Sequence, residues 1–139
     1  MRQQDIAYEL AKKGHEGQFR RDGVTPYLNH VLDVARIAQM RGGNDDVIAA
    51  ATAHDLLEDS SFSKFDLLNA GLSQVVVDAV IDLTHLHEGE SYEQAILRAK
   101  NNPIARQVKI ADNLSNLSDA PTDKQILKYA KSLQTLMQE

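Results

Sequence analysis

Apolar residues recur at spacings of three and four along most of the chain, which is the period of an amphipathic helix. Alternation of the kind found in strands is nearly absent, and the three prolines and most glycines fall between the periodic segments. The pattern predicts helices over residues 3–13, 31–41, 45–58, 64–70, 74–84, 92–100 and 103–117, and a last helix after Thr122. We therefore expect an all-α domain over residues 1–139, a compact bundle of about seven or eight helices.

Residues that favour helix N-termini precede most of these segments. Ser91 and Gln94 have the spacing of a capping box, and Pro103 stands where proline is favoured in a first turn. The other expected caps are Asn29, Ser63, Ser73 and Thr122. These local signals support the helical assignment.

The run from His54 to Asp59 reads His-Asp-Leu-Leu-Glu-Asp and is the most informative segment of the chain. If residues 45–58 form one helix, His54, Asp55, Glu58 and Asp59 fall within an arc of about 140°. A histidine nitrogen and a carboxylate oxygen can bind one divalent cation, and the two later carboxylates stand where a proton-transfer group is needed. The alternative is the polar end of an ordinary helix, so other residues must decide.

Two further side chains are candidate ligands for such a cation. His30 follows Pro26-Tyr27-Leu28-Asn29 at the start of a predicted helix, although a histidine there also serves as a hydrogen-bonding residue of the helix end. Asp112 lies beside the apolar arc of residues 104–117, where a partly buried carboxylate needs a partner and aspartate is a poor helix former. We expect His15 to fix a loop, and His85 and His87 to lie on the surface.

The composition excludes several classes of protein. There is no cysteine among the 139 residues, which removes thiolate nucleophiles, cysteine zinc sites and disulfides. No apolar leader and no run of membrane-spanning length is present, so we expect a cytoplasmic protein with no membrane partner. The net charge of −5 argues against non-specific nucleic-acid binding, which needs a basic face.

Four ordered segments resemble the metal-dependent HD-domain hydrolases of the RelA/SpoT type, in particular the small stand-alone alarmone hydrolases. The segments are His15-Glu16-Gly17-Gln18-Phe19-Arg20, Thr25-Pro26-Tyr27-Leu28-Asn29-His30, His54-Asp55-Leu56-Leu57-Glu58-Asp59 and Val108-Lys109-Ile110-Ala111-Asp112-Asn113-Leu114-Ser115-Asn116. The similarity covers about residues 7–119. Four motifs in one order are far more specific than a single His-Asp pair.

The resemblance implies a role for each matching residue. It implies Mn²⁺ as cofactor, held by His30, His54, Asp55 and Asp112, with Glu58 and Asp59 as the catalytic acidic pair. The implied substrate contacts are Arg20, Arg21, Asp22 and Asn116. Three positions depart from the family pattern: Val31 replaces a proline, Asp22 a serine beside the nucleotide base, and Asp119 a threonine. The two aspartates add negative charge near an anionic ligand.

The expected function is Mn²⁺-dependent removal of the 3′-pyrophosphate from guanosine tetra- or pentaphosphate, with a small-molecule nucleotide as substrate. The alternatives are hydrolysis of another nucleotide, such as ppApp or the 2′-phosphate of NADPH, and a non-catalytic HD module that binds a nucleotide or a protein. A purely assembling role of the helices is a further alternative. The oligomeric state is left open by the sequence.

Overall fold

The computed structural model describes residues 1–84 and 88–139 and has helices throughout this part of the chain. The helices are α1 (Gln3–Gly14), α2 (Tyr27–Met40), α3 (Asp45–Ala53), α4 (Leu56–Asp59), α5 (Lys64–Asn69), α6 (Gln74–Leu83), α7 (Tyr92–Lys100), α8 (Pro103–Leu117) and α9 (Asp123–Met137). Over the described residues, eight helices have six residues or more, α4 has four, and the β-structure is one isolated bridge between Phe19 and Pro26. The predicted all-α class is therefore confirmed.

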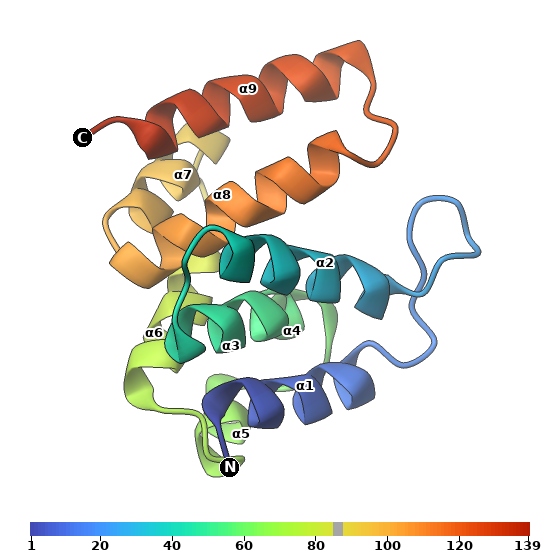
Figure 1. The fold of residues 1–139 in the computed structure, drawn as a ribbon, viewed down its shortest axis with the longest axis vertical. Coiled ribbons are helices and arrows are strands. Elements are labelled where there is room, and N and C mark those ends of the chain that lie inside the picture. The colour runs from blue at the N-terminus through green and yellow to red at the C-terminus, as the bar shows by residue number, and fades with distance from the viewer. Residues whose placement is uncertain (85–87) are drawn as a thin grey trace.

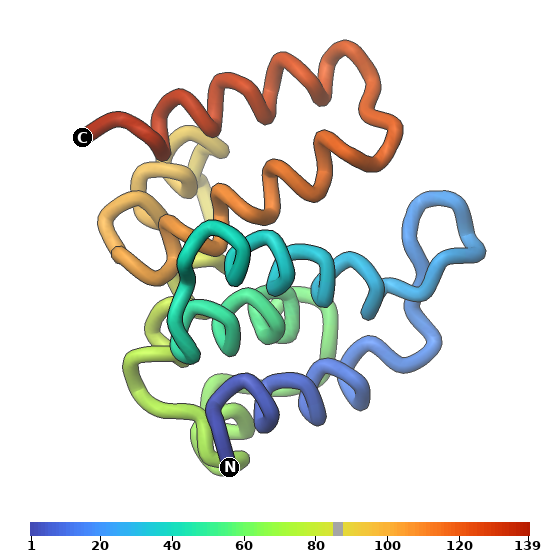
Figure 2. Tube along the Cα trace, viewed as in Figure 1, coloured from blue at the N-terminus to red at the C-terminus, as the bar shows by residue number. Residues whose placement is uncertain are grey.

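The helix α3 lies at the centre of the bundle and contacts α1, α2, α6 and α8 (Figure 1). At one end of the molecule, α7, α8 and α9 pack against one another, and the chain's two termini lie far apart in the view (Figure 2). In the described ranges, no helix has both the length and the apolar character needed to cross a membrane. His85 and His87, which we expected on the surface, lie outside the described residues.

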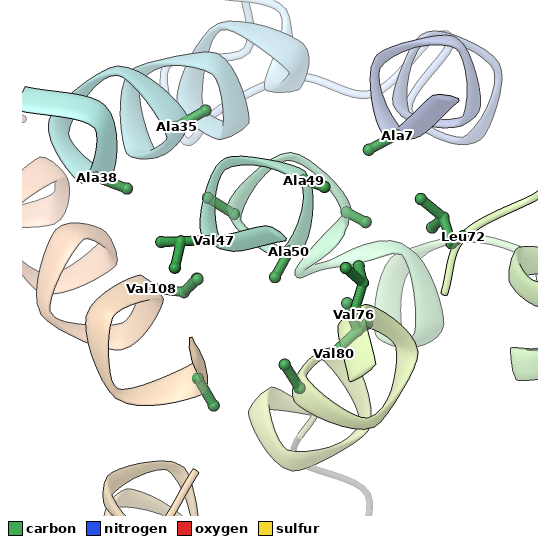
Figure 3. Packing of buried hydrophobic residues seen from close by; sticks show 14 of the residues in the cluster. Ala7, Ala35, Ala38, Val47, Ala49, Ala50, Leu72, Val76, Val80 and Val108 are labelled. Carbon is green, nitrogen blue, oxygen red and sulfur yellow. The ribbon is translucent and has the colours of Figure 1, made fainter. Parts of the chain in front are cut away.

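Small side chains allow the central position of α3. Its alanines Ala49, Ala50, Ala51 and Ala53 are all fully buried, so neighbouring helices approach its backbone closely. Figure 3 shows Ala49 and Ala50 surrounded by apolar residues of α1, α2, α6 and α8. Close packing of this kind holds α2, α3 and α8 in fixed relative positions.

The predicted helix ends are mostly correct. Ser63, Ser73, Ser91 and Thr122 each accept a hydrogen bond from the backbone N–H three residues on, and the Ser91–Gln94 capping box is present. The expected cap Asn29 is wrong, because α2 begins two residues earlier at Tyr27. The reason is a non-local hydrogen bond in which the N–H of Tyr27 donates to the carbonyl of Gln18 at 2.8 Å.

The predicted helix over residues 45–58 is interrupted at His54 and Asp55. The ring Nδ1 of His54 lies 2.6 Å from the carbonyl oxygen of Ala51, and Asp55 has φ −101° and ψ 0°, outside the helical region. The chain resumes as α4 at Leu56, whose side chain is fully buried. The arc of about 140° that a continuous helix would give therefore does not describe these side chains, since His54 and Asp55 lie in a turn.

Candidate metal centre

His30, His54, Asp55 and Asp112 come together where three packed helices meet. His30 belongs to α2, His54 and Asp55 form the turn between α3 and α4, and Asp112 belongs to α8. These elements contact one another directly, and both histidines and Asp112 are buried. Each side chain is thus positioned by a well-packed backbone.

The distances within this cluster are those of side chains directed at a common point. His30 Nε2 lies 3.0 Å from Asp112 Oδ1, and His54 Nε2 lies 3.0 Å from Asp55 Oδ2 and 3.6 Å from Asp112 Oδ1. One ligand atom from each of His30, His54 and Asp55 falls within 4.8 Å of the others. Two nitrogen and two oxygen donors in this arrangement suit a divalent transition metal.

Hydrogen bonds on the far side of each ring determine which imidazole nitrogen faces the cluster. The carbonyl of Ala51 can only accept, so Nδ1 of His54 carries the proton in that hydrogen bond. The hydroxyl of Ser115 donates to Asp33 Oδ2 at 2.8 Å and can therefore only accept from His30 Nδ1, which lies 3.2 Å away. Both Nε2 atoms thus point toward the carboxylates.

This arrangement requires a positive charge between the nitrogens and the oxygens. The Nε2 atom of His54 is buried and has no hydrogen-bond partner among the described residues, although two carboxylates lie close to it. A lone pair facing carboxylate oxygens is repulsive unless a proton or a cation separates them. The donor set and the orphaned Nε2 atom both fit a divalent cation.

In the absence of a cation, the pKa values of His54 and Asp112 show that the imidazole groups and the carboxylates of the cluster attract each other. Burial lowers the pKa of His54, but the Asp55 and Asp112 carboxylates outweigh burial and hold that pKa well above its usual value. Burial raises the pKa of Asp112, but the Lys109 ammonium group and the two histidines hold it well below the usual range.

The two carboxylates predicted as ligands, Asp55 and Asp112, are held by neighbours that were not among the predicted site residues. The hydroxyl of Tyr27 donates to Asp55 Oδ2 at 2.5 Å, and Lys109 Nζ donates to Asp112 Oδ2 at 3.2 Å. Burial and the nearby Asp55 carboxylate raise the pKa of Tyr27, so its hydroxyl stays a donor. The signal for Lys109 was its position one helical turn before Asp112, where the two side chains meet.

Glu58 and Asp59 lie on α4 beside the cluster. Carboxylate oxygens of Asp55, Glu58 and Asp59 come within 4.8 Å of one another. Burial, followed by the charges of Asp55 and Glu58, raises the pKa of Asp59, which increases the affinity of this carboxylate for a proton. The predicted acidic pair is thus next to the predicted ligands, although on a separate short helix.

Two cavities that share no lining residue reach the cluster. The first, here called the arginine cavity, has a volume of about 550 Å³ and is lined by His30, Ser115, Asp119 and the first-loop residues Arg20 and Arg21, among others. The second, here called the lysine cavity, has about 430 Å³ and contains His54, Asp55, Glu58, Asp112, Lys109 and Lys128 in its wall. A ligand bound at the cluster can extend into either cavity.

The arginines of the first cavity are paired with Asp119 in the turn between α8 and α9. Arg20 Nη2 donates to Asp119 Oδ2 at 2.6 Å, and Arg21 Nη2 donates to the Asp119 carbonyl at 3.2 Å. Arg20 also lies 3.4 Å from Asn116 Oδ1, so two predicted contact residues adjoin. These bonds join the loop between α1 and α2 to the turn between α8 and α9, which lie on the same side of the molecule (Figure 1).

Asp22 has a local role in the first loop. Its carboxylate accepts hydrogen bonds from the Thr25 hydroxyl and from the N–H groups of Thr25 and Val24. These bonds, the Thr25 hydroxyl first, lower the pKa of Asp22 to about 2. The added negative charge of Asp22 is therefore compensated within the loop.

His15 has the loop-fixing contacts that we expected, with Nδ1 2.8 Å from Gln18 Oε1.

Comparison with known proteins gives one matching family and several relatives. The model of a family described as HD domain matches residues 7–137. The guanosine-3′,5′-bis(diphosphate) 3′-pyrophosphohydrolase MESH1 of Xenopus tropicalis is 36% identical over 120 residues, which are 81% of this chain and 66% of that protein. A probable GTP pyrophosphokinase of Mycobacterium leprae is 31% identical over 94% of this chain and 18% of its own length.

A solved structure has the same fold. It is described as a metazoan ortholog of SpoT that hydrolyzes ppGpp, and it aligns with a TM-score of 0.81 and 27% identity over 97% of this chain and 85% of its own. The chain spans less than a fifth of the first two curated relatives, at 18% and 17% of their lengths, and 66% of the MESH1 protein.

Proposed function

Because the chain belongs to the HD-domain family, we propose that it is a Mn²⁺-dependent hydrolase that removes the 3′-pyrophosphate of guanosine tetra- or pentaphosphate. The products are GDP or GTP and pyrophosphate. The observation that carries the proposal is the pair of buried imidazole Nε2 atoms facing two carboxylates, each fixed by a hydrogen bond behind the ring. The name of the MESH1 relative, which aligns with 81% of the chain, supports the choice of substrate.

The proposed ligands of the cation are His30, His54, Asp55 and Asp112, with Mn²⁺ as the ion. When bound, a divalent cation supplies Lewis-acid activation of water and of the phosphoryl group. Tyr27 and Lys109 then keep the two carboxylates in place through the hydrogen bonds that they donate. The roles of the protein side chains in the proton transfer follow from their positions.

Water adds to the phosphorus attached to the 3′-oxygen, and the bond between this phosphorus and the 3′-oxygen breaks. We assign the proton of the attacking water to the acidic pair Glu58 and Asp59, whose carboxylate oxygens lie within 4.8 Å of Asp55. Glu58 lines the lysine cavity and orients the water there. The leaving 3′-oxygen takes up one proton, so that atoms and charge balance.

The proposed substrate contacts are Arg20, Arg21, Asp22 and Asn116. The two guanidinium groups offer planar sets of donors that match phosphate oxygens. Asn116 adjoins both Arg20 and the cluster, because its side-chain amide lies 3.4 Å from Asp112 Oδ1. Asp22 contributes by shaping the loop that carries the arginines.

The test is turnover by the purified protein with Mn²⁺, offered ppGpp, pppGpp, ppApp and NADPH in separate reactions, with the products resolved by anion exchange. We expect pyrophosphate from the guanosine substrates, and loss of this turnover in Asp55→Asn. The exposed Asp78, which lies on α6 away from the cluster, provides the matched control Asp78→Asn, which retains turnover.

Other outcomes identify other functions. Inorganic phosphate from NADPH without pyrophosphate from ppGpp indicates a 2′-phosphatase, and faster turnover of ppApp indicates an adenosine substrate. Binding of these nucleotides by the Mn²⁺-loaded protein, with no turnover of any of them, indicates a non-catalytic module and contradicts the proposal.

A further inference from the structure

We propose that Lys128 and Tyr92 form a phosphate subsite in the lysine cavity, which holds the terminal phosphoryl group of the departing pyrophosphate. This inference rests on the proposed function and names two residues that the sequence motifs did not include. Lys128 lies on α9 and Tyr92 begins α7, and these two helices pack side by side at one end of the molecule (Figures 1 and 2). Both side chains line the cavity that also contains His54, Asp55 and Asp112.

The cations around the cluster differ in their pairing with carboxylates. Arg20 and Arg21 are paired with Asp119, and Lys109 is paired with Asp112 at 3.2 Å. Lys128 differs from these, because no carboxylate of the described residues lies within 4.0 Å of its ammonium group. Its positive charge is therefore available to a ligand, whereas the other three cations must first give up a carboxylate partner.

Lys128 lies against an aromatic ring. Its Nζ atom lies 4.4 Å from the centroid of the Tyr92 ring, which is cation–π geometry. This contact keeps the ammonium group at the cavity wall and leaves its N–H donors for an anion. The Ser91–Gln94 capping box in turn fixes the start of α7 and hence the backbone of Tyr92.

The hydroxyl of Tyr92 is a second potential donor of this subsite. Its oxygen is buried and has no hydrogen-bond partner among the described residues. A buried hydroxyl without a partner is unfavourable, and a phosphate oxygen in the cavity would accept its proton. Lys128 and Tyr92 thus provide a charged donor and a neutral donor on one wall.

The lysine cavity also contains the carboxylates of Asp55, Glu58, Asp82 and Asp112, and a divalent cation at the cluster would offset the two that are proposed ligands. Asp112 is paired with Lys109, and Asp82 accepts a hydrogen bond from the Asn102 side chain at 3.0 Å. Together with Ile96, the subsite residues Tyr92 and Lys128 also line a groove of about 690 Å³ between α7 and α9. These shared residues place the groove directly beside the lysine cavity.

The assignment of the pyrophosphate to this cavity follows from the proposed contacts on the other side. With the nucleoside diphosphate part of the substrate held by Arg20 and Asn116 and the scissile phosphoryl group at the cluster, the terminal phosphoryl group extends into the lysine cavity. Lys128 then distinguishes a 3′-pyrophosphate, which reaches it, from a single 3′-phosphate, which does not.

The test is calorimetric titration of inorganic pyrophosphate, and separately of inorganic phosphate, into the protein at saturating Mn²⁺, corrected by the same titrations without protein. We expect Lys128→Ala to weaken pyrophosphate binding on the order of 10- to 100-fold, the usual effect of losing a charged hydrogen bond. Phosphate binding stays unchanged, and Lys128→Arg restores part of the pyrophosphate affinity. Tyr92→Phe weakens pyrophosphate binding by a smaller factor.

The matched control is Lys124→Ala, which removes an exposed lysine of the same helix and leaves both affinities unchanged.

Turnover gives a second readout. We expect Lys128→Ala to lower kcat/KM for ppGpp and to leave it unchanged for the analogue with a single 3′-phosphate. The proposal is overturned if the wild type does not bind pyrophosphate, if Lys128→Ala binds it as tightly as the wild type, or if both substrates lose kcat/KM equally. Pyrophosphate binding that depends on Lys128, in a protein that does not hydrolyse ppGpp, would refute the proposed function and leave the subsite in place.

Discussion

Replacement of Ser115 by alanine tests whether the hydrogen bonds behind the imidazole rings prepare the cluster for a cation. Ser115 is buried, accepts from His30 Nδ1 at 3.2 Å and donates to Asp33 Oδ2 at 2.8 Å. The substitution removes both bonds and leaves the buried Nδ1–H of His30 without its acceptor. The cost of such an orphaned group is about 1–3 kcal/mol of unfolding free energy.

Two measurable effects follow from this loss. For a chain of 139 residues, an unfolding entropy of roughly 0.3 kcal/mol per kelvin converts this cost into a Tm lower by about 3–10 °C. The ring of His30 also loses the partner that fixes its tautomer and orientation, so Mn²⁺ affinity falls by about 10- to 100-fold. Electron paramagnetic resonance of free Mn²⁺ measures the affinity, and calorimetry of the metal-free protein measures the Tm.

Ser118 provides the matched control for this experiment. Its hydroxyl donates to the Ser115 carbonyl at 2.7 Å at the end of the same helix, and this bond does not involve the His30 ring. Ser118→Ala removes the same chemical group nearby, so it is expected to leave Mn²⁺ affinity at the wild-type value. Equal Mn²⁺ affinities of Ser115→Ala and the wild type, or an equal loss in both variants, would contradict this role of Ser115.

Three further predictions concern stability. Addition of Mn²⁺ at 100 times its Kd stabilises the protein by about 2.7 kcal/mol, which raises the Tm by about 9 °C. Calorimetry should find no such shift in Asp55→Asn or in the presence of EDTA. A full shift in the variant would exclude Asp55 as a ligand. Gly43→Ala places a Cβ 2.8 Å from the Ala38 carbonyl oxygen and lowers the unfolding free energy in urea by about 1–3 kcal/mol, and an unchanged value would contradict this packing. Because the pKa of Asp22 is lowered from 3.8 to about 2 by its bonds to Thr25 and Val24, its stabilising contribution is present above pH 4 and is lost as pH falls through 2. The difference in unfolding free energy between wild type and Asp22→Asn should therefore shrink over that range, and a constant difference would argue against the hydrogen-bonded loop.

The features that the sequence predicted correctly are those set by near neighbours along the chain. The caps at Ser63, Ser73, Ser91 and Thr122 depend on contacts within three residues, and apolar periodicity determines the helix class. The candidate ligands could also be named, because their residue types and order form a specific pattern.

The features that the sequence did not predict depend on distant contacts. At the break, Asp55 accepts a hydrogen bond from the hydroxyl of Tyr27, which is 28 residues away along the chain, in addition to the local bond of the His54 ring to Ala51. The pairing of Arg20 with Asp119 joins residues 99 apart, so the sequence alone could not show that Arg20 compensates the negative charge of Asp119. Lys128 stands in none of the motifs, and only the packing of α9 against α7 brings it near Tyr92.

We propose that this cluster supports hydrolysis at the 3′-phosphorus. The most direct measurement is the reaction of the wild-type protein with ppGpp in water enriched in ¹⁸O, with Mn²⁺ or with EDTA, followed by mass spectrometry of the products. We predict GDP and pyrophosphate with Mn²⁺ alone, and one ¹⁸O atom in the pyrophosphate, because water adds to the phosphorus that leaves. Equal turnover in EDTA, or ¹⁸O in the GDP, would contradict the claim.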